Sequence, residues 1–403
     1  MSTNVGRHRR SSAFRPVADY GCLSDPGRSP FEDATVRTYQ PPQDPSASST
    51  SEGNHSGSAP PQLAASRAYT LSLSPYFLYT RSSLMSIVLS SKVYSQLEFM
   101  AVGSWWIHSP GQSTAEDSDL GATRIFHRVP GNREDVFADT HISMKSKRTL
   151  MRLLRHISKP QDEDSSEEDE DLSSSFGEYL SSKFDVPQDL HNPLLSLSLS
   201  QLAQQDTSAS YAVPRIKRHL ASIGAVGPGF GGVVPKYGGG SEILQVACRA
   251  SAVGGGVYAL DTGIQSIDDS ASTTEDHPVT VRLSNEESVR AKTVVGSTWD
   301  LSLKEQPLPS TKVARSITIV SSGFDSLFTV TTEGAPLPAS AVLMFPGDSL
   351  DSPQSPPVYL QVHSSDTGDC PRKQSKSCLF LQLSFLFPPA RMMTTFTTYL
   401  HCL

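Results

Sequence analysis

The sequence predicts an α/β protein in which a small helical block interrupts a strand-forming body. Residues 67–143 and 224–369 contain short apolar runs, rich in branched and aromatic residues, that have the length of β-strands. Between residues 144 and 223 the apolar positions recur instead at the three- and four-residue spacing of helices. Strands on both sides of a helical stretch are expected when helices are inserted into one α/β body.

The charge of the chain is concentrated in one short segment. The 403 residues carry a formal net charge of −7, and residues 162–171, DEDSSEEDED, hold eight acidic and no basic side chains. The rest of the chain therefore sums to about +1, which gives no support for a nucleic-acid-binding protein. We expect an acidic loop on a nearly neutral body.

Cysteine usage and the chain ends predict a soluble cytosolic protein. Five scattered cysteines do not make a disulfide framework, which favours a reducing compartment. The N-terminal sequence MSTNVGRHRRSSAF lacks the apolar core of a signal peptide. The apolar run at 378–390 contains Gln382, ends at two prolines and is shorter than the roughly 20 residues of a membrane span.

The first 143 residues contain an arm followed by structured segments. Residues 1–66 are rich in Ser, Pro and Gly and predict a disordered arm. Leu84, Ile87 and Val88 recur at helical spacing, with Arg81 to Ser83 as plausible starting residues. Residues 96–107 and 124–129 predict two strands, so the first part of the large domain is assigned to residues 67–143.

The block 144–223 predicts a small helical domain that carries the acidic loop. Its first helix has an apolar stripe and a basic face, with the stripe formed by Leu150, Met151, Leu153, Leu154 and Ile157 and the basic face by Lys145, Arg148, Arg152 and Arg155. The basic face is either simply solvated or a docking surface for an acidic protein or an anionic membrane. Further helical fragments run from residue 172 to 223.

Residues 224–369 predict the second part of the large domain. Glycine-rich turns flank a helix expected over residues 242–252. Six strands are expected after it, over residues 256–260, 279–283, 291–295, 315–322, 341–346 and 358–365. The remaining residues, 370–403, predict a tail outside this body.

No catalytic or metal-binding pattern stands out. The sequence contains no GxSxG, HExxH or paired CxxC. A GxGxxG spacing at Gly227, Gly229 and Gly232 is followed by Val-Val-Pro and not by a helix, so it predicts a loop. We therefore expect no enzyme activity, no metal and no cofactor.

One polar row on the predicted helix 242–252 is a candidate recognition surface. Glu242 and Arg249 are seven residues apart, which places them two helical turns apart on one face, and Gln245 lies on the same side. Spacing alone leaves three interpretations: a helix-end arrangement, an intramolecular salt bridge or a polar recognition strip.

Three ordered segments resemble the superfamily of Rab GDP-dissociation inhibitors and Rab escort proteins. They are YTLSLSPYFLYTRSSLMSIVLSSKVYSQLEFMAVGSWWI (69–107), VPGNREDVFADTHISMKSKRTLMRLLRHI (129–157) and YGGGSEILQVACRASAVGGGVYAL (237–260). The pair Cys248–Arg249, the acidic serine-rich insertion and HSSDTG (363–368) look more like the fungal escort type than an inhibitor. The resemblance covers residues 67–369.

The resemblance implies a large domain like that of flavin monooxygenases, without flavin, and an inserted helical domain. It implies binding of GDP-bound Rab GTPases, their presentation to the geranylgeranyl transferase heterodimer, contact with the geranylgeranyl lipid and delivery to membranes. Its implied location is the cytosol with transient membrane association, with the nucleus as a second possible location. The implied Rab-binding residues are Tyr237, Glu242, Gln245, Arg249 and Tyr258. The implied transferase- and lipid-facing residues are Lys147, Arg148, Leu150, Met151, Leu153 and Leu154.

The sequence also departs from the family pattern at both ends. Residues 1–66 lack the strand–GxGxxE–helix unit with which the family opens, and the pattern stops after Cys370. We therefore expect an incomplete large domain whose first strand–turn–helix is missing. Two alternatives remain: a flavin-dependent oxidoreductase of similar fold, and a truncated, nonfunctional escort-protein product.

Overall fold

A computed structural model of the chain describes most of residues 64–382. The described ranges are 64–72, 75–109, 126–131, 133–140, 142–158, 170–260, 262–268, 279–296, 313–349 and 355–382, with the two-residue strands β1 (Thr3–Asn4) and β2 (Thr35–Val36). The predicted arm 1–66 and acidic loop 162–171 lie largely outside these residues. The chain divides into two units, one from residues 67–250 and 310–403 and one from residues 1–66 and 251–309. Each is described by itself.

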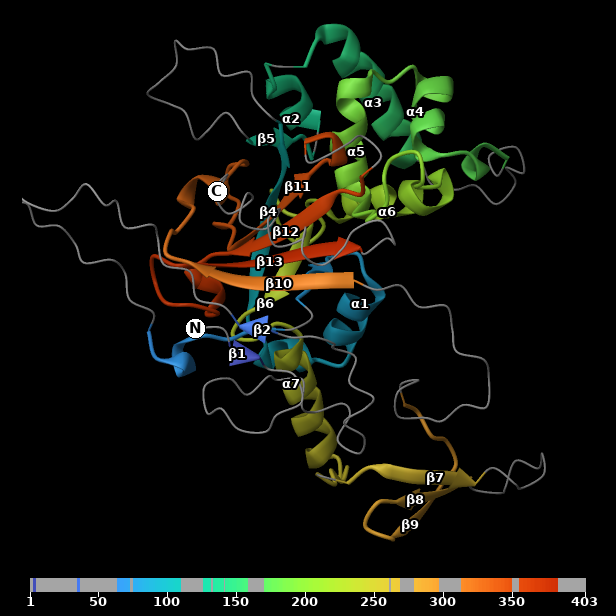
Figure 1. The fold of residues 1–403 in the computed structure, drawn as a ribbon, viewed down its shortest axis with the longest axis vertical. Helices are drawn as coiled ribbons and strands as arrows, with labels where there is room; N and C mark the ends of the chain where they lie inside the picture. The colour runs from blue at the N-terminus through green and yellow to red at the C-terminus, as the bar shows by residue number, and fades with distance from the viewer. Residues whose placement is uncertain are drawn as a thin grey trace, which may run out of the picture. The chain divides into compact units, whose positions relative to one another are not determined.

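The larger unit is organised around a mixed sheet (Figure 1). Its strands are β3 (Leu78–Tyr79), β4 (Phe99–His108), β5 (Phe126–Val129), β6 (Gly232–Pro235), β10 (Val313–Val320), β11 (Ser340–Phe345), β12 (Val358–His363) and β13 (Ser375–Gln382). They lie in the order β10-β13-β12-β11-β4-β6-β3, with β5 added on β4. The pair β4–β11 is parallel and the other pairs are antiparallel.

The centre of the sheet is buried on both faces. Alternate residues of a strand point to opposite faces, and β11 shows the consequence. Val342 and Met344 belong to one hydrophobic cluster, whereas Leu343 and Phe345 belong to another. All six residues of β11 and all six of β12 are buried. After Ser340, β11 is accordingly a continuous apolar run, whereas β12 also buries the polar residues Gln361 and His363.

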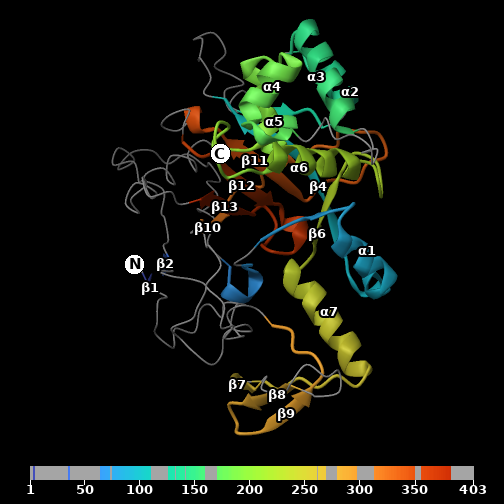
Figure 2. The same cartoon turned by 90° about the vertical axis from the view of Figure 1, so that its right-hand side faces the viewer.

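Helices cover one face of this sheet (Figure 2). The helices of the unit are α1 (Ser83–Ser90), α2 (Arg133–Ala138), α3 (Met144–Ser158), α4 (Phe176–Phe184), α5 (His191–Ser198), α6 (Ala209–Ser222) and α7 (Gly240–Val253), the last of which ends in the smaller unit. The apolar stripe of α3 packs with residues of α4, α5 and α6 and with sheet residues such as Trp105 and Val342 in one cluster.

The helix starts follow capping rules. Ser82 accepts a hydrogen bond from the backbone N–H of Met85 at the start of α1, as the sequence predicts. Ser175 and Glu178 form a reciprocal capping box at the start of α4. Short 3-10 helices lie at 66–68, 93–96, 170–173, 188–190, 325–327, 347–349 and 365–367.

The smaller unit contains an antiparallel sheet of β7 (Ile264–Asp268), β8 (Val279–Leu283) and β9 (Ser288–Ala291). The strand predicted over residues 256–260 is wrong: these residues are exposed, pair with no strand that the structure describes and follow Gly255 at φ +92°. The strand predicted over 291–295 lies earlier, because Glu286 at φ +69° makes a tight turn and β9 pairs immediately after it.

The part of the predicted tail that the structure describes belongs to the sheet. Ser375–Gln382 forms β13 between β10 and β12, and residues 370 and 374–378 are buried. The expectation that the body ends at Cys370 is therefore wrong for these residues, because long-range pairing recruits them. No helix in the described ranges combines the length and the apolar content needed to cross a bilayer.

Candidate functional site

The site is built on the turn that joins β6 to α7. Tyr237 lies in the left-handed region at φ +68°, and Gly239 follows at φ +61°. A non-glycine residue is uncommon there and needs local support. The backbone N–H of Tyr237 supplies part of it by donating to the carbonyl of Thr367 at 2.8 Å. The turn is thus held by a loop that lies far away in the sequence.

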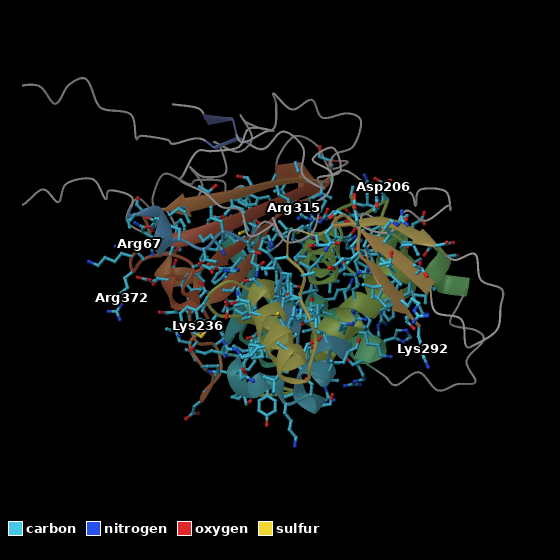
Figure 3. All side chains as sticks on the ribbon, turned by 90° about the horizontal axis from the view of Figure 1, so that it is seen from below. Arg67, Asp206, Lys236, Lys292, Arg315 and Arg372 are labelled. Carbon is cyan, nitrogen blue, oxygen red and sulfur yellow. The ribbon has the colours of Figure 1, made fainter. Side chains whose placement is uncertain are left out.

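The ring of Tyr237 lies against this loop and remains half exposed to solvent. A Cβ on Gly368 would come within 2.5 Å of Cδ1 of Tyr237, so only glycine allows this approach. Lys236, labelled in Figure 3, places Nζ 4.9 Å from the centroid of the Tyr237 ring and 2.6 Å from Oε1 of Glu98. Hydrogen bonds to Glu98 and Tyr237 raise the pKa of Lys236. The tyrosine is fixed in place yet accessible.

We predict that Gly368→Ala destabilises the protein more than an alanine at a matched open glycine. Gly368 lies at φ +78° against Tyr237, whereas Gly334 lies at φ +76° in space where an added Cβ would meet no described atom within 4 Å. Both substitutions carry a left-handed backbone cost of about 1–2 kcal/mol, and only the first adds a clash. Urea unfolding of both variants measures the difference. Equal losses for the two variants would contradict the close packing at Gly368.

The polar row of α7 lies on a solvent-accessible face of the helix. Val246 is the buried residue of α7, whereas Glu242 is half-buried and Gln245 and Arg249 are exposed. Nε2 of Gln245 lies 3.5 Å from Oε1 of Glu242. In the part of the chain that the structure describes, Arg249 forms no ion pair with Glu242, so the intramolecular salt-bridge interpretation is wrong. Arg249 therefore retains its five N–H donors for a partner.

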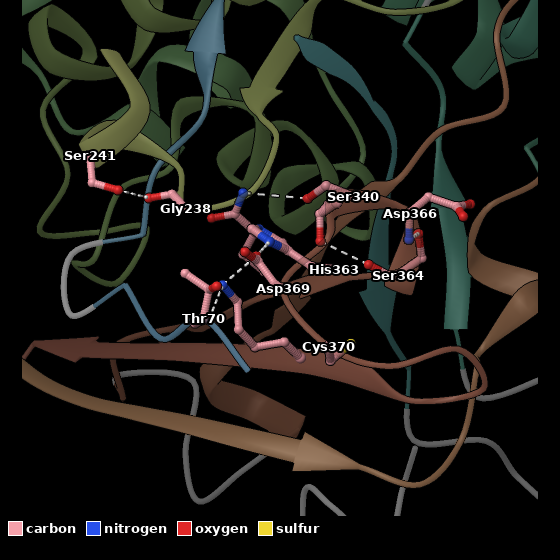
Figure 4. A network of polar contacts seen from close by, with 12 residues as sticks. Thr70, Gly238, Ser241, Ser340, His363, Ser364, Asp366, Asp369 and Cys370 are labelled. Carbon is pink, nitrogen blue, oxygen red and sulfur yellow. Dashed lines mark hydrogen bonds and ion pairs between the residues drawn. The ribbon is translucent and has the colours of Figure 1, made fainter. Parts of the chain in front are cut away.

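Behind the turn, a buried polar network supports the loop 364–374 (Figure 4). Asp369 accepts hydrogen bonds from His363 Nδ1 at 2.8 Å and from Lys376 Nζ. The same loop presents Thr367 and Gly368 to Tyr237. Sequence reasoning missed these residues as part of a site. The available signal was HSSDTGD, in which a histidine, a glycine and an acidic residue fall within one short loop.

The predicted transferase- and lipid-facing residues of α3 are mostly interior. Leu150, Leu153 and Leu154 are only 4%, 0% and 8% exposed. Lys147 is also buried and donates to the carbonyl of Phe137 at 3.0 Å. In this structure these four residues stabilise the packing of the helices, and their role toward a transferase or a lipid stays a prediction.

The outer face of α3 is polar and basic. Arg148 is exposed, Met151 is half-buried, and the other exposed cations of this face are Lys145, Arg152 and Arg155. Arg152 donates to the carbonyl of Phe184 and lies 6.0 Å from its ring, so it is partly engaged within the fold.

Tyr258 belongs to the smaller unit and is 50% exposed. Tyr237, Glu242, Gln245 and Arg249 all belong to the larger unit, where the turn and α7 bring them together. Among the described residues no group of three or more His, Cys, Asp or Glu side chains could hold a metal ion.

These features define a mixed α/β protein with an exposed aromatic and polar turn–helix surface. The crystal structure of the Rab GDI from Plasmodium falciparum has this fold: it superposes with a TM-score of 0.60 at 17% identity, over 82% of this chain and 71% of that one. The family model described as GDP dissociation inhibitor matches residues 51–333. The chain belongs to the GDP dissociation inhibitor family, which confirms the resemblance inferred from the three segments.

Several curated relatives are named as the component A of Rab geranylgeranyltransferase. The Rab proteins geranylgeranyltransferase component A of Candida albicans is 25% identical over 314 residues, which are 77% of this chain and 46% of that protein. The component A of Saccharomyces cerevisiae is 25% identical over 310 residues, which are 76% and 46% of the two chains. The chain thus spans about half the length of the curated relatives it matches.

Proposed function

We propose that this chain is a Rab escort protein that binds GDP-bound Rab GTPases through the β6–α7 turn and α7. The observation that carries the proposal is the accessible row of Glu242, Gln245 and Arg249 beside the fixed ring of Tyr237. An exposed arginine and tyrosine that are pre-positioned on a rigid turn and helix suit a protein interface, since these residue types dominate binding energy. Tyr258, in the smaller unit, is proposed separately as a further Rab-contacting residue.

In this proposal the escort role also brings the chain into contact with the geranylgeranyl transferase and with membranes. The bound Rab is presented to the geranylgeranyl transferase heterodimer, and the lipidated product is delivered to membranes from the cytosol. The chain itself performs no catalysis and uses no cofactor. The names of the fungal relatives, which are components of Rab geranylgeranyltransferase, support this assignment.

The helical block 144–223 acts in this proposal as a domain inserted between 67–143 and 224–369 of a flavin-monooxygenase-like domain. The exposed basic face of α3, including Arg148, contacts the transferase. The buried Leu150, Leu153 and Leu154 reach the geranylgeranyl chain only when helices of the block move apart, because they now form its interior.

Retention of a Rab GTPase on the immobilised chain tests the proposal. We expect the GDP-loaded Rab to be retained more strongly than the same Rab loaded with a GTP analogue. Arg249→Ala should weaken retention about tenfold or more, as at an interface hot spot. Arg155→Ala, which removes another exposed helical arginine, is the matched control and should leave retention unchanged.

Two outcomes would overturn the proposal. One is a folded chain that does not retain GDP-bound Rab. The other is equal loss of binding in Arg249→Ala and Arg155→Ala, which would indicate general charge attraction. A purified chain with the visible absorption of a flavin would instead favour the oxidoreductase alternative.

A further inference from the structure

The hairpin of β12 and β13 is closed by a buried polar triad. His363 and Lys376 are opposite each other in the register of the two strands. Both side chains reach the same oxygen, Oδ2 of Asp369, in the loop between the strands. The three residues are 5%, 3% and 1% exposed in the order His363, Asp369, Lys376. The carboxylate of Asp369 thus connects the loop between the strands to both β12 and β13 (Figure 4).

The protonation of the triad follows from its surroundings. Burial raises the pKa of Asp369, but the hydrogen bond from His363 and the charge of Lys376 outweigh it and hold the pKa below its usual value. Burial lowers the pKa of His363. A neutral His363 therefore donates from Nδ1 to the carboxylate, and its Nε2 has no partner among the described residues.

The loop closed by Asp369 also contacts the candidate site. The carbonyl of Asp369 accepts from the backbone N–H of Thr70 at 2.9 Å. One and two residues earlier, Gly368 and Thr367 support the ring and the backbone N–H of Tyr237. Only Gly368 thus separates the residue with the buried carboxylate from Thr367, whose carbonyl fixes the Tyr237 turn.

A purely stabilising role does not require this chemistry. Replacing a buried ion pair with apolar residues of similar volume is often neutral or stabilising. A triad that joins two strands and a loop through one oxygen atom specifies the position of that loop. Apolar side chains fill the same space with less directional constraint.

We propose that Asp369, held by His363 and Lys376, is a positioning residue that fixes the Tyr237 turn in its partner-binding geometry. The effect on partner affinity rests on the proposed Rab-binding function. The effect on the turn itself does not. The two can therefore be measured separately on the same protein.

The first measurement is hydrogen exchange of the Tyr237 backbone amide in the full chain. His363→Phe keeps a ring but removes the donor to Asp369, and His363→Gln keeps an N–H donor. We expect His363→Phe to speed exchange at Tyr237 and Thr70 about tenfold, in line with the loss of a hydrogen bond to a charged group. Exchange at Ile216, in the core of α6, should stay unchanged. His363→Gln should restore much of the protection.

Two results would overturn the positioning role. One is unchanged exchange at Tyr237 in His363→Phe. The other is equal acceleration at Tyr237 and Ile216, which would show a global loss of stability. Asp369→Asn combined with Lys376→Met removes both charges and provides a second variant. Fast exchange at Tyr237 in this folded double variant supports the proposal, and wild-type exchange contradicts it.

The second measurement is the affinity for GDP-loaded Rab. We expect His363→Phe to weaken binding about tenfold and His363→Gln to weaken it less. If the wild-type chain binds no Rab while Tyr237 exchange still depends on His363, the positioning role stands and the proposed partner fails. If the wild-type chain and His363→Phe bind Rab equally well, the positioning role fails and the proposed function stands.

Discussion

Asp369→Asn should lower the free energy of unfolding by about 3–5 kcal/mol at neutral pH. The substitution retains the size of the side chain but removes its charge, and it takes the counter-charge away from the ammonium of Lys376, which is buried at 1% exposure. The Nδ1–H of His363 loses its charged acceptor at the same time. Urea unfolding monitored by circular dichroism measures the loss.

Two controls separate the buried charge from the rest of the change. Lys373→Met removes an exposed cation from the same loop and should change stability by less than about 0.5 kcal/mol. Adding Lys376→Met to Asp369→Asn should recover much of the lost stability, because the buried cation is then removed as well. A single Asp369→Asn variant as stable as the wild type would show that the triad is not desolvated in solution.

Stability should fall by about 3 kcal/mol between pH 6.5 and 4 because of His219 alone. Burial lowers the pKa of His219 from 6.5 to about 4. The folded protein therefore binds fewer protons than the unfolded chain in this window. The stability that the neutral, buried His219 contributes is complete above about pH 6.5. It is lost as the pH falls toward the pKa of His219 in the folded protein. The ring lies 4.5 Å from that of Trp105, and Nδ1 lies 3.4 Å from the hydroxyl of Tyr79.

The variant His219→Gln should flatten this acid dependence. Its unfolding free energy, measured at several pH values, should change much less between pH 6.5 and 4 than that of the wild type. A smaller slope should remain, because burial also lowers the pKa of His108 and His363. His127→Gln, at an exposed histidine of β5, is the control. An unchanged slope in His219→Gln would contradict the prediction.

The elements that the sequence predicted well have a strong local signal. The stripe of α3, the apolar run of β11 and the largely apolar sequence of β12 indicate burial directly. The failures are segments whose structure depends on a distant partner. Residues 256–260 have strand-like composition but pair with no described strand, whereas 375–382 find partners in β10 and β12.

The same limit applies to the candidate site. Helical spacing was sufficient to place Glu242, Gln245 and Arg249 on one face of α7. It could not show that Thr367 and Gly368 hold Tyr237, because that contact depends on how two distant loops meet. The role of Asp369 depends in the same way on the register of β12 and β13. The apolar stripe of α3 was evident from periodicity. Only the structure shows that its leucines are buried against the other helices of the block.

The parallel pairing of β4 with β11 has a consequence for how the chain folds. Residues 99–108 find this neighbour only when residues 340–345 are available. Until then the helices of the block 144–223 lack part of the surface on which they pack, since Val342 and Met344 belong to their cluster. Such late, long-range closure slows folding and leaves an open strand edge during synthesis. The growing chain therefore exposes this edge of β4 until residues 340–345 have been made.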